Sequence, residues 1–228
     1  MPFTPSEANK IRNSKIQSLT PGLKRALVDF IVSGSIKKDR LAGEVWERTH
    51  HTMMVHATHS VPAMKPIAIR IDKAINSWKV LIHEPYDSDF EDLDRLFRDS
   101  WEDYSDEDFD MEKVSDFIHE IQPTRLLNSE KDDEVKEDEL DPDLDFDSAR
   151  VIGVVVGGNL LSRGLTVEGL TISYFVRPAG TYDAAIQMCR WNGIRSSLDR
   201  ELIRVHLTGD MRSDYQWLNL VEKDLRED

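Results

Sequence analysis

The spacing of apolar positions along the chain predicts six helices. Apolar residues recur every three or four positions, which places them on one face of a helix. Thr20 before Pro21 marks the start of the first helix, because threonine caps helices and proline favours the first helical position. A capping box from Ser88 to Glu91 and an acidic cap at Asp110 start two others. The predicted helices cover about 20–34, 62–78, 88–104, 110–121, 181–190 and 210–228.

Runs of consecutive apolar residues predict a parallel β-sheet. The run 151–156 consists of valine, isoleucine and one glycine, and such β-branched runs are typical of strands covered on both faces. Further strands are predicted at 52–57, 170–176 and 203–207. Because strands and helices alternate in the second half of the chain, the pattern predicts an α/β fold with a parallel sheet.

Four aromatic residues follow the helical repeat in the third predicted helix: Phe90, Phe97, Trp101 and Tyr104. The simplest interpretation is that they pack in the core while the acidic residues between them form a solvated surface. The alternative is an exposed aromatic face that binds a partner protein.

The composition is that of a folded cytoplasmic protein. Of the 228 residues, 39% are hydrophobic and 32% are charged, so the apolar content is sufficient for a core. No apolar run approaches the roughly 18 residues that a membrane-spanning helix requires. The single cysteine, Cys189, excludes a disulfide framework and a multi-cysteine zinc site.

Charge is distributed unevenly along the chain. Residues 84–147 hold 27 acidic and 6 basic side chains, a net charge of −21, whereas the other residues hold 16 acidic and 23 basic side chains, a net charge of +7. The overall charge of −14 therefore describes neither part. We predict an arm or linker over 1–18, a core over 19–61 and 148–228, and a helical, strongly acidic insertion over 62–147 with a mobile loop at about 129–147.

A glycine-rich segment follows the predicted strand 151–156, at the end where open α/β sheets bind ligands. Its glycines allow close approach of the backbone, Ser162 offers a hydroxyl, and Arg163 offers a planar cation suited to phosphate. The pattern G-x-x-x-x-G-K-[ST] of a Walker A loop occurs nowhere in the chain. The alternative interpretation is a glycine-rich turn in which Arg163 pairs with a local acid.

A second segment places Arg190 and Arg195 around Gly193 at a predicted helix end. Both guanidinium groups could reach one polyanion, since arginine carries a permanent charge and forked donors. The alternative is a surface helix end whose arginines complement the helix dipole.

Histidines cluster around the strand 52–57, and a hydrogen-bonded cluster at the strand ends is favoured over a metal site. No metal site is predicted. His59 and Ser60, just after the strand, could contact a nucleic-acid backbone.

The glycine-rich segment and the arginine segment are parts of two longer motifs. A weaker pattern lies upstream of them: Pro21-x-Leu23-Lys24-x-Ala26-Leu27, followed by the strand and loop 53–60. This combination resembles the signature of the Z-one domain family, which belongs to the superfamily-two helicase-like ATPases of bacterial restriction and phage-defence systems. The two principal motifs are Gly157-Gly158-Asn159-x-Leu161-Ser162-Arg163-Gly164-Leu165-Thr166-x-Glu168-Gly169-Leu170-Thr171-x-Ser173-Tyr174-Phe175 and Gln187-Met188-x-Arg190-Trp191-x-Gly193-x-Arg195.

The resemblance implies a RecA-like second helicase domain. Arg163 and Gly164 would fall in the motif that contacts both nucleotide and nucleic acid, and Ser162 would join Arg163, His59 and Ser60 on the DNA backbone. The second motif would supply Arg190 and Arg195 as arginine fingers, with nucleotide contacts from Gln187, Gly164 and Gly193. ATP and magnesium would be held by a first RecA-like domain, so this chain alone is not expected to hydrolyse ATP. The implied partners are DNA, that first motor domain and a nuclease subunit.

Four positions depart from the family pattern: Cys189 replaces a glycine, Asn192 an aromatic residue, Ile194 a tyrosine and Thr166 the ribose-binding aspartate of many helicases. Two other hypotheses are therefore considered together with the motor hypothesis. One is a non-catalytic module that docks a nuclease subunit through the acidic helices. The other is a degenerate motor domain that is retained only for structure.

Overall fold

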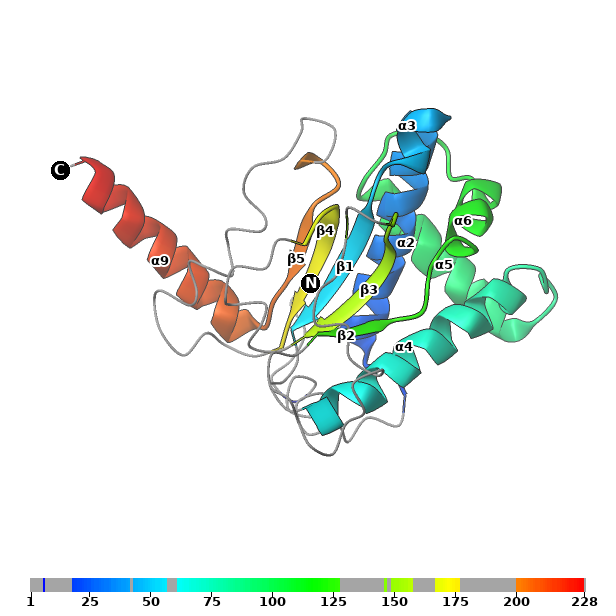
Figure 1. Ribbon diagram of the computed structural model, residues 1–228, viewed down its shortest axis with the longest axis horizontal. Coiled ribbons are helices and arrows are strands. Elements are labelled where there is room, and N and C mark those ends of the chain that lie inside the picture. Colours follow the sequence, from blue (N-terminus) through cyan, green and yellow to red (C-terminus); the bar gives the residue numbers. More distant parts are fainter. Residues whose placement is uncertain are drawn as a thin grey trace.

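A parallel β-sheet forms the centre of the molecule in the computed structural model (Figure 1). The structure describes residues 6, 18–41, 43–56, 61–127, 146, 149–157, 167–176 and 200–227. Within these ranges five strands lie in the order β2-β3-β1-β4-β5, and every neighbouring pair is parallel. The strands are β1 (His51–His56), β2 (Arg125–Leu127), β3 (Ile152–Gly157), β4 (Leu170–Phe175) and β5 (Arg204–His206). The predicted α/β fold with a parallel sheet is confirmed.

The described helices divide between the two sides of the sheet. In Figure 1, α2, α4, α5 and α6 gather on one side, whereas α9 leaves the end of β5 and projects away from the body. The helices are α2 (Pro21–Leu41), α3 (Glu44–Glu47), α4 (Val61–Leu81), α5 (Ser88–Glu102), α6 (Met111–Ile118) and α9 (Gly209–Glu227). No described helix is long and apolar enough to cross a membrane.

The sheet is buried on both faces, as its apolar runs predict. All six residues of β1, of β3 and of β4 are buried. On one face, Met53 and Val55 of β1 join a large core with α2, α4, α5 and α6. On the other face, Met54 and Phe175 join a smaller core that includes Met211 of α9.

Five of the six predicted helices fall on described residues, where the structure has a helix at each place, with differences at the ends. The first helix continues past Gly34 to Leu41, because Gly34 is a helix-packing position: a Cβ there would overlap the ring of Phe117. The capping box predicted at Ser88 is wrong, since the cap of α5 is Asp87, whose Oδ1 accepts a hydrogen bond of 2.8 Å from the amide of Asp89.

The described part of the acidic region 62–147 packs into the same hydrophobic core as the sheet. α4, α5 and α6 contribute to the same hydrophobic cluster as β1 and β3, and β2 pairs with β3. Of the predicted aromatic stripe, Phe97, Trp101 and Tyr104 are buried in this cluster, which confirms the core interpretation for these three residues, whereas Phe90 is half-buried. The predicted domain boundaries stay a prediction. Most of the arm 1–18 and of the loop 129–147, and the whole predicted helix 181–190, lie outside the described residues.

Candidate functional site

The carboxyl ends of four strands lie side by side in register. Leu127 of β2 is paired with Gly157 of β3, Gly157 with His56 of β1, and His56 with Phe175 of β4. Each of these is the last residue of its strand. Because neighbouring strands lie about 4.8 Å apart, the chain leaves the sheet at a row of adjacent points, which we call the carboxyl edge.

Three segments that follow this edge carry all the residues predicted to bind nucleotide or DNA. They are 57–60 after β1, 158–166 after β3 and 177–199 between β4 and β5. The structure brings the starting points of the three segments together. The side chains themselves lie outside the described residues: His59, Ser60, Ser162, Arg163, Gly164, Gln187, Arg190, Gly193 and Arg195.

The described residues at the carboxyl edge form a packed base. His56 is buried, and its ring meets the ring of Phe175 edge to face with centroids 6.0 Å apart. The amide of Val176 donates a 3.0 Å hydrogen bond to the carbonyl of His56, which extends the pairing of β1 and β4 by one residue. The positions at which segments 57–60 and 177–199 leave the sheet are thereby fixed relative to each other.

A buried carboxylate lies beside this edge, where α2, α5 and β5 meet. Asp29 of α2 has only 7% of its side chain exposed. It accepts a 2.6 Å hydrogen bond from Ser100 Oγ of α5 and a 2.9 Å hydrogen bond from Arg25 Nε of α2. His206 Nε2 of β5 lies 3.1 Å from Asp29 Oδ2, within ion-pair distance. We call Arg25, Asp29, Ser100 and His206 the Asp29 cluster.

The charges around Asp29 keep it ionised. Burial by itself would raise the pKa of the Asp29 carboxyl, yet His206, Ser100 and Arg25 together hold this pKa below its ordinary value. Tyr104 lies nearby and stays neutral. Burial, together with the charge of Asp29, raises the pKa of the Tyr104 hydroxyl far above its usual range. The cluster is therefore anionic at its centre and bordered by a neutral phenol.

Two arginines connect the Asp29 cluster to the end of α5. Arg25 Nη2 also contacts Asp103 Oδ2 at 2.7 Å. Arg204 of β5 donates to the carbonyl oxygen of Asp103 at 2.9 Å and stacks 4.2 Å from the ring centroid of Tyr104. These contacts join residues 78 and 101 positions apart, so they fix β5 and α2 against the end of α5.

Sequence reasoning missed the Asp29 cluster. The signal was available in part, because Asp29 interrupts an apolar run of α2 that is otherwise buried and stands four residues after Arg25. The partners from α5 and β5 could not be deduced, since nothing in the spacing of the chain brings His206 to Asp29.

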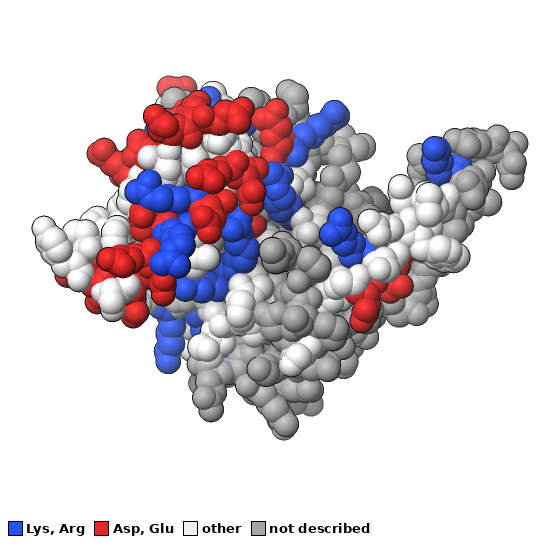
Figure 2. All heavy atoms as spheres, turned by 180° about the vertical axis from the view of Figure 1, so that it is seen from behind, with Lys and Arg blue, Asp and Glu red and all other residues white. Residues whose placement is uncertain are grey.

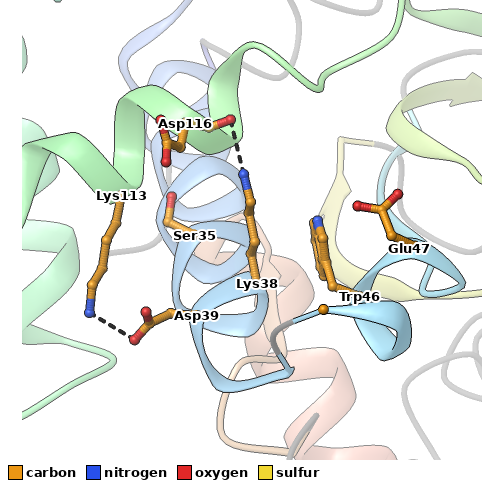
Figure 3. A pocket seen from close by; sticks show the side chains of 8 residues that line it. Ser35, Lys38, Asp39, Trp46, Glu47, Lys113 and Asp116 are labelled. Carbon is orange, nitrogen blue, oxygen red and sulfur yellow. Dashed lines mark hydrogen bonds and ion pairs between the residues drawn. The ribbon is translucent and has the colours of Figure 1, made fainter.

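The described cavity lies at the opposite, amino-terminal end of the sheet (Figure 3). It has a volume of about 300 Å³ and is lined by residues of α2, α3 and α6 with Gly43. Figure 3 shows Lys113 turned toward Asp39, with which it forms a 2.7 Å ion pair, and Lys38 turned toward the carbonyl of Asp116. Both lysines are thus engaged within the protein.

A second carboxylate, Glu120, anchors the wall of this cavity. Lys38 Nζ lies 2.7 Å from Glu120 Oε1, and Arg150 Nη2 lies 2.7 Å from Oε2. The indole Nε1 of Trp46 donates to Oε2 at 3.1 Å, and Arg150 stacks 4.6 Å from the centroid of the Trp46 ring. Burial would raise the pKa of Glu120, but Lys38 and Arg150 lower it. We call Lys38, Trp46, Glu120 and Arg150 the Glu120 cluster.

The histidines at the start of β1 are engaged in hydrogen bonds. His50 Nδ1 accepts a 3.0 Å hydrogen bond from the amide of Val151. His51 is buried, lies 3.0 Å through Nε2 from the carbonyl of Phe30, and stacks on the ring of Phe30 at 4.8 Å. Within the described ranges, no group of three or more His, Cys, Asp or Glu side chains could hold a metal ion.

The fold and its strand-end segments define the chain as an α/β protein built on a parallel sheet, with candidate ligand residues at the carboxyl edge. A family model described as the Z1 domain matches residues 22–228, so the chain belongs to the Z1 domain family. This confirms the family to which the sequence motifs were assigned. Searches of curated proteins and of solved structures gave no match.

Proposed function

We propose that this chain is the second motor domain of an ATP-dependent DNA helicase or translocase in a restriction or phage-defence complex. The parallel sheet would then be a RecA-like domain whose carboxyl edge faces ATP held by a first motor domain. Membership of the Z1 family and the two sequence motifs support the proposal.

The observation that carries this proposal is the in-register carboxyl edge. β1 is central, β3 and β4 are its two neighbours, and each of the three is followed directly by a segment with candidate phosphate-binding residues. Open α/β sheets bind ligands outside the carboxyl ends of their strands, where the strand order changes direction. Here the connection from β1 runs to β2 on one side and the connection from β4 runs to β5 on the other, so the change of direction falls between β1 and β4.

In this function Arg190 and Arg195 would act on ATP, whereas Arg163, two serines and His59 would act on DNA. Arg190 and Arg195, on the segment between β4 and β5, would stabilise the charge that develops on the γ-phosphate. Gln187, Gly164 and Gly193 would line the nucleotide. The DNA backbone would be contacted by Ser162, Arg163, His59 and Ser60.

ATP and magnesium would come from the partner domain. The chain has no Walker A sequence, so it lacks the lysine and hydroxyl that a P-loop uses for the phosphates and for Mg²⁺. Activity therefore belongs to the complete motor, in which the two domains close over the nucleotide.

The test is the substitution Arg190→Ala in the complete protein that contains this domain. DNA-stimulated ATPase activity should fall by roughly 10³-fold or more, as for arginine fingers of related NTPases. Arg48→Ala is the matched control, because Arg48 is an exposed arginine between α3 and the start of β1, at the opposite end of the sheet from the carboxyl edge, and it should change the rate less than twofold. An Arg190→Ala protein within twofold of the wild-type rate would refute the finger role.

A second candidate function is a module that docks a nuclease subunit through the acidic surface of α5. Phe97 and Trp101 of this helix are buried, and its exposed side presents Glu91, Asp99 and Glu102. Figure 2 shows acidic side chains gathered along one side of the molecule, with lysines and arginines among them.

Deletion of 89–147 cannot discriminate the two functions, because it would remove α5, α6 and β2 from the core. Reversal of three surface charges, Glu91→Lys, Asp99→Lys and Glu102→Lys, leaves the core intact. Loss of nuclease assembly with ATPase activity retained would favour docking by these acids, whereas retained assembly would exclude it.

A further inference from the structure

We propose that His83 and His119 form a binding site for a divalent transition-metal ion that links the end of α4 to the end of α6. His83 lies two residues after α4, and His119 directly follows α6 as its cap. Both side chains are exposed, and Nε2 of His83 lies 3.4 Å from Nε2 of His119. We call these two residues the histidine pair.

The two rings of the histidine pair face each other through their Nε2 atoms. The ring planes lie within 19° of parallel, and the ring centroids are 5.7 Å apart. The centroid distance exceeds the 3.4 Å between the Nε2 atoms by about twice the distance from the centre of a ring to its own nitrogen. Both Nε2 atoms therefore lie close to the line between the two ring centres.

The separation of the two nitrogens fits a shared metal ion better than a direct hydrogen bond. A good hydrogen bond from a ring N–H measures about 2.7–3.2 Å, so 3.4 Å is long for one. Zinc–imidazole bonds of about 2.0–2.1 Å at a tetrahedral angle place two nitrogen ligands about 3.3–3.4 Å apart. Because both side chains are exposed, each ring can tilt until its Nε2 lone pair points at an ion beside the line between them.

Neighbouring contacts hold the backbones that carry the histidine pair. Asp72 Oδ1 accepts hydrogen bonds of 2.9 and 2.7 Å from the amide and the hydroxyl of Thr124. Lys79 Nζ donates to the carbonyl of Ile121 at 3.2 Å. Positions 72, 79 and 83 share one face of a helix, and their partners follow in reverse order at 124, 121 and 119. The histidine pair is the third contact of one antiparallel row, so the fold itself sets its separation.

The chemistry of the donors selects the ion. Imidazole nitrogen suits zinc, copper and nickel, whereas calcium and magnesium prefer oxygen ligands. Among the residues that the structure describes, no third His, Cys, Asp or Glu side chain completes the site. Two protein ligands leave coordination positions open to water, unlike the closed four-ligand sites of structural zinc. The bound ion would therefore be an exchangeable clamp between α4 and α6.

Titration calorimetry of Zn²⁺ into the chain, prepared without a histidine tag, tests the site. Wild type should bind one Zn²⁺ at the histidine pair. His83→Ala or His119→Ala should weaken this binding by at least about 10- to 100-fold, since loss of even an outer partner of a metal ligand has an effect of this size. His50→Gln is the matched control and should bind as wild type does, because His50 lies just before β1 and accepts the amide of Val151. Equal Zn²⁺ affinity in wild type and both alanine variants would overturn the inference.

Two comparisons separate one shared site from scattered weak binding. If both imidazoles hold the same ion, the double variant His83→Ala with His119→Ala should bind Zn²⁺ no more weakly than either single variant. Mg²⁺, which binds carboxylates, should bind wild type and the variants equally. A double variant that binds still more weakly, or Mg²⁺ binding that also depends on the histidine pair, would overturn the inference.

Hydrogen exchange measures whether the ion links the two helix ends. The amides of Ile82 and Glu84 form backbone hydrogen bonds at the end of α4. Saturating Zn²⁺ should slow their exchange in wild type and leave it unchanged in His119→Ala, which removes the ligand on the α6 side. Unchanged exchange in zinc-saturated wild type would overturn the clamp. These measurements use neither ATP nor DNA, so their outcomes are separate from those that test the proposed function.

Discussion

The Asp29 cluster and the Glu120 cluster have almost the same composition but occupy different environments. Each has one carboxylate, two cationic or titratable nitrogen partners and one neutral donor, Ser100 for Asp29 and Trp46 for Glu120. Asp29 is 7% exposed and lies beside the carboxyl edge, whereas Glu120 is 25% exposed and lies at the amino-terminal end of the sheet.

The difference in exposure sets how strongly each carboxylate is coupled to its partners. Water and salt screen the partly exposed pairs of Glu120, and such pairs typically contribute up to about 1 kcal/mol. Asp29 itself is shielded from water, whereas Arg25, at 29% exposure, is as exposed as Lys38 in the Glu120 cluster. The two clusters therefore differ in the burial of the carboxylate and not in the burial of the cations. Equal lists of contacts therefore do not imply equal contributions to stability.

The largest expected effect is the loss of stability in Asp29→Ala. The expected cost is about 3 kcal/mol, because the substitution removes the buried acceptor of Ser100 Oγ and a partner of Arg25, although Arg25 keeps its contact with Asp103. Glu120→Ala should cost only about 1–2 kcal/mol, since Arg150 keeps its stacking on Trp46 and water can replace the carboxylate. Urea unfolding measures both losses, and a larger loss for Glu120→Ala would reverse the comparison.

An intermediate effect is expected in the acid dependence of stability. The folded-state pKa of Asp29 lies below its ordinary value of 3.8 because His206, Ser100 and Arg25 outweigh the effect of burial. The stability that the ionised carboxylate contributes is therefore complete above the unfolded pKa and is lost as pH falls through the lowered folded pKa.

Urea unfolding at a series of pH values tests this dependence. The difference in unfolding free energy between wild type and Asp29→Asn should shrink as pH falls from about 5 toward 2. A difference that stays constant over this interval would contradict the ionised state assigned to Asp29.

The smallest effect is the response to salt. At about 1 M salt the screening length falls to roughly 3 Å, so the destabilisation by Glu120→Gln should decrease by about 0.5 kcal/mol. The destabilisation by Asp29→Asn should change less, because the Asp29 carboxylate is only 7% exposed. Equal salt responses for the two variants would show that the two clusters are equally screened.

The sheet and most helices were predictable because each one follows a local pattern. Apolar runs identified β1, β3 and β4, and helical spacing identified α4 and α5. β2 was missed because three residues are too few to show a period. The end of α2 was misplaced because Gly34 indicates a helix end in isolation, whereas its lack of a side chain serves the contact with Phe117.

The sequence identified the residues of the candidate site but did not predict how they are arranged in space. The sequence motifs identify Arg163, Arg190 and Arg195, and the alternation of strands and helices predicts the parallel strands that precede them. The order of those strands was not predictable, because it depends on pairing between segments about 100 residues apart. For the same reason His206 could not be connected with Asp29 from the sequence.

The central position of β1 has a consequence for synthesis of the chain. His51 pairs with Ile152, and His56 pairs with Phe175, so the first strand made has no partner in the sheet until more than 100 further residues exist. At roughly 5–20 residues per second, β1 would wait about 5–25 seconds on the ribosome with its apolar side chains and strand edges unpaired. Nascent chains of this domain are thus exposed to aggregation for an interval that the sheet order itself imposes.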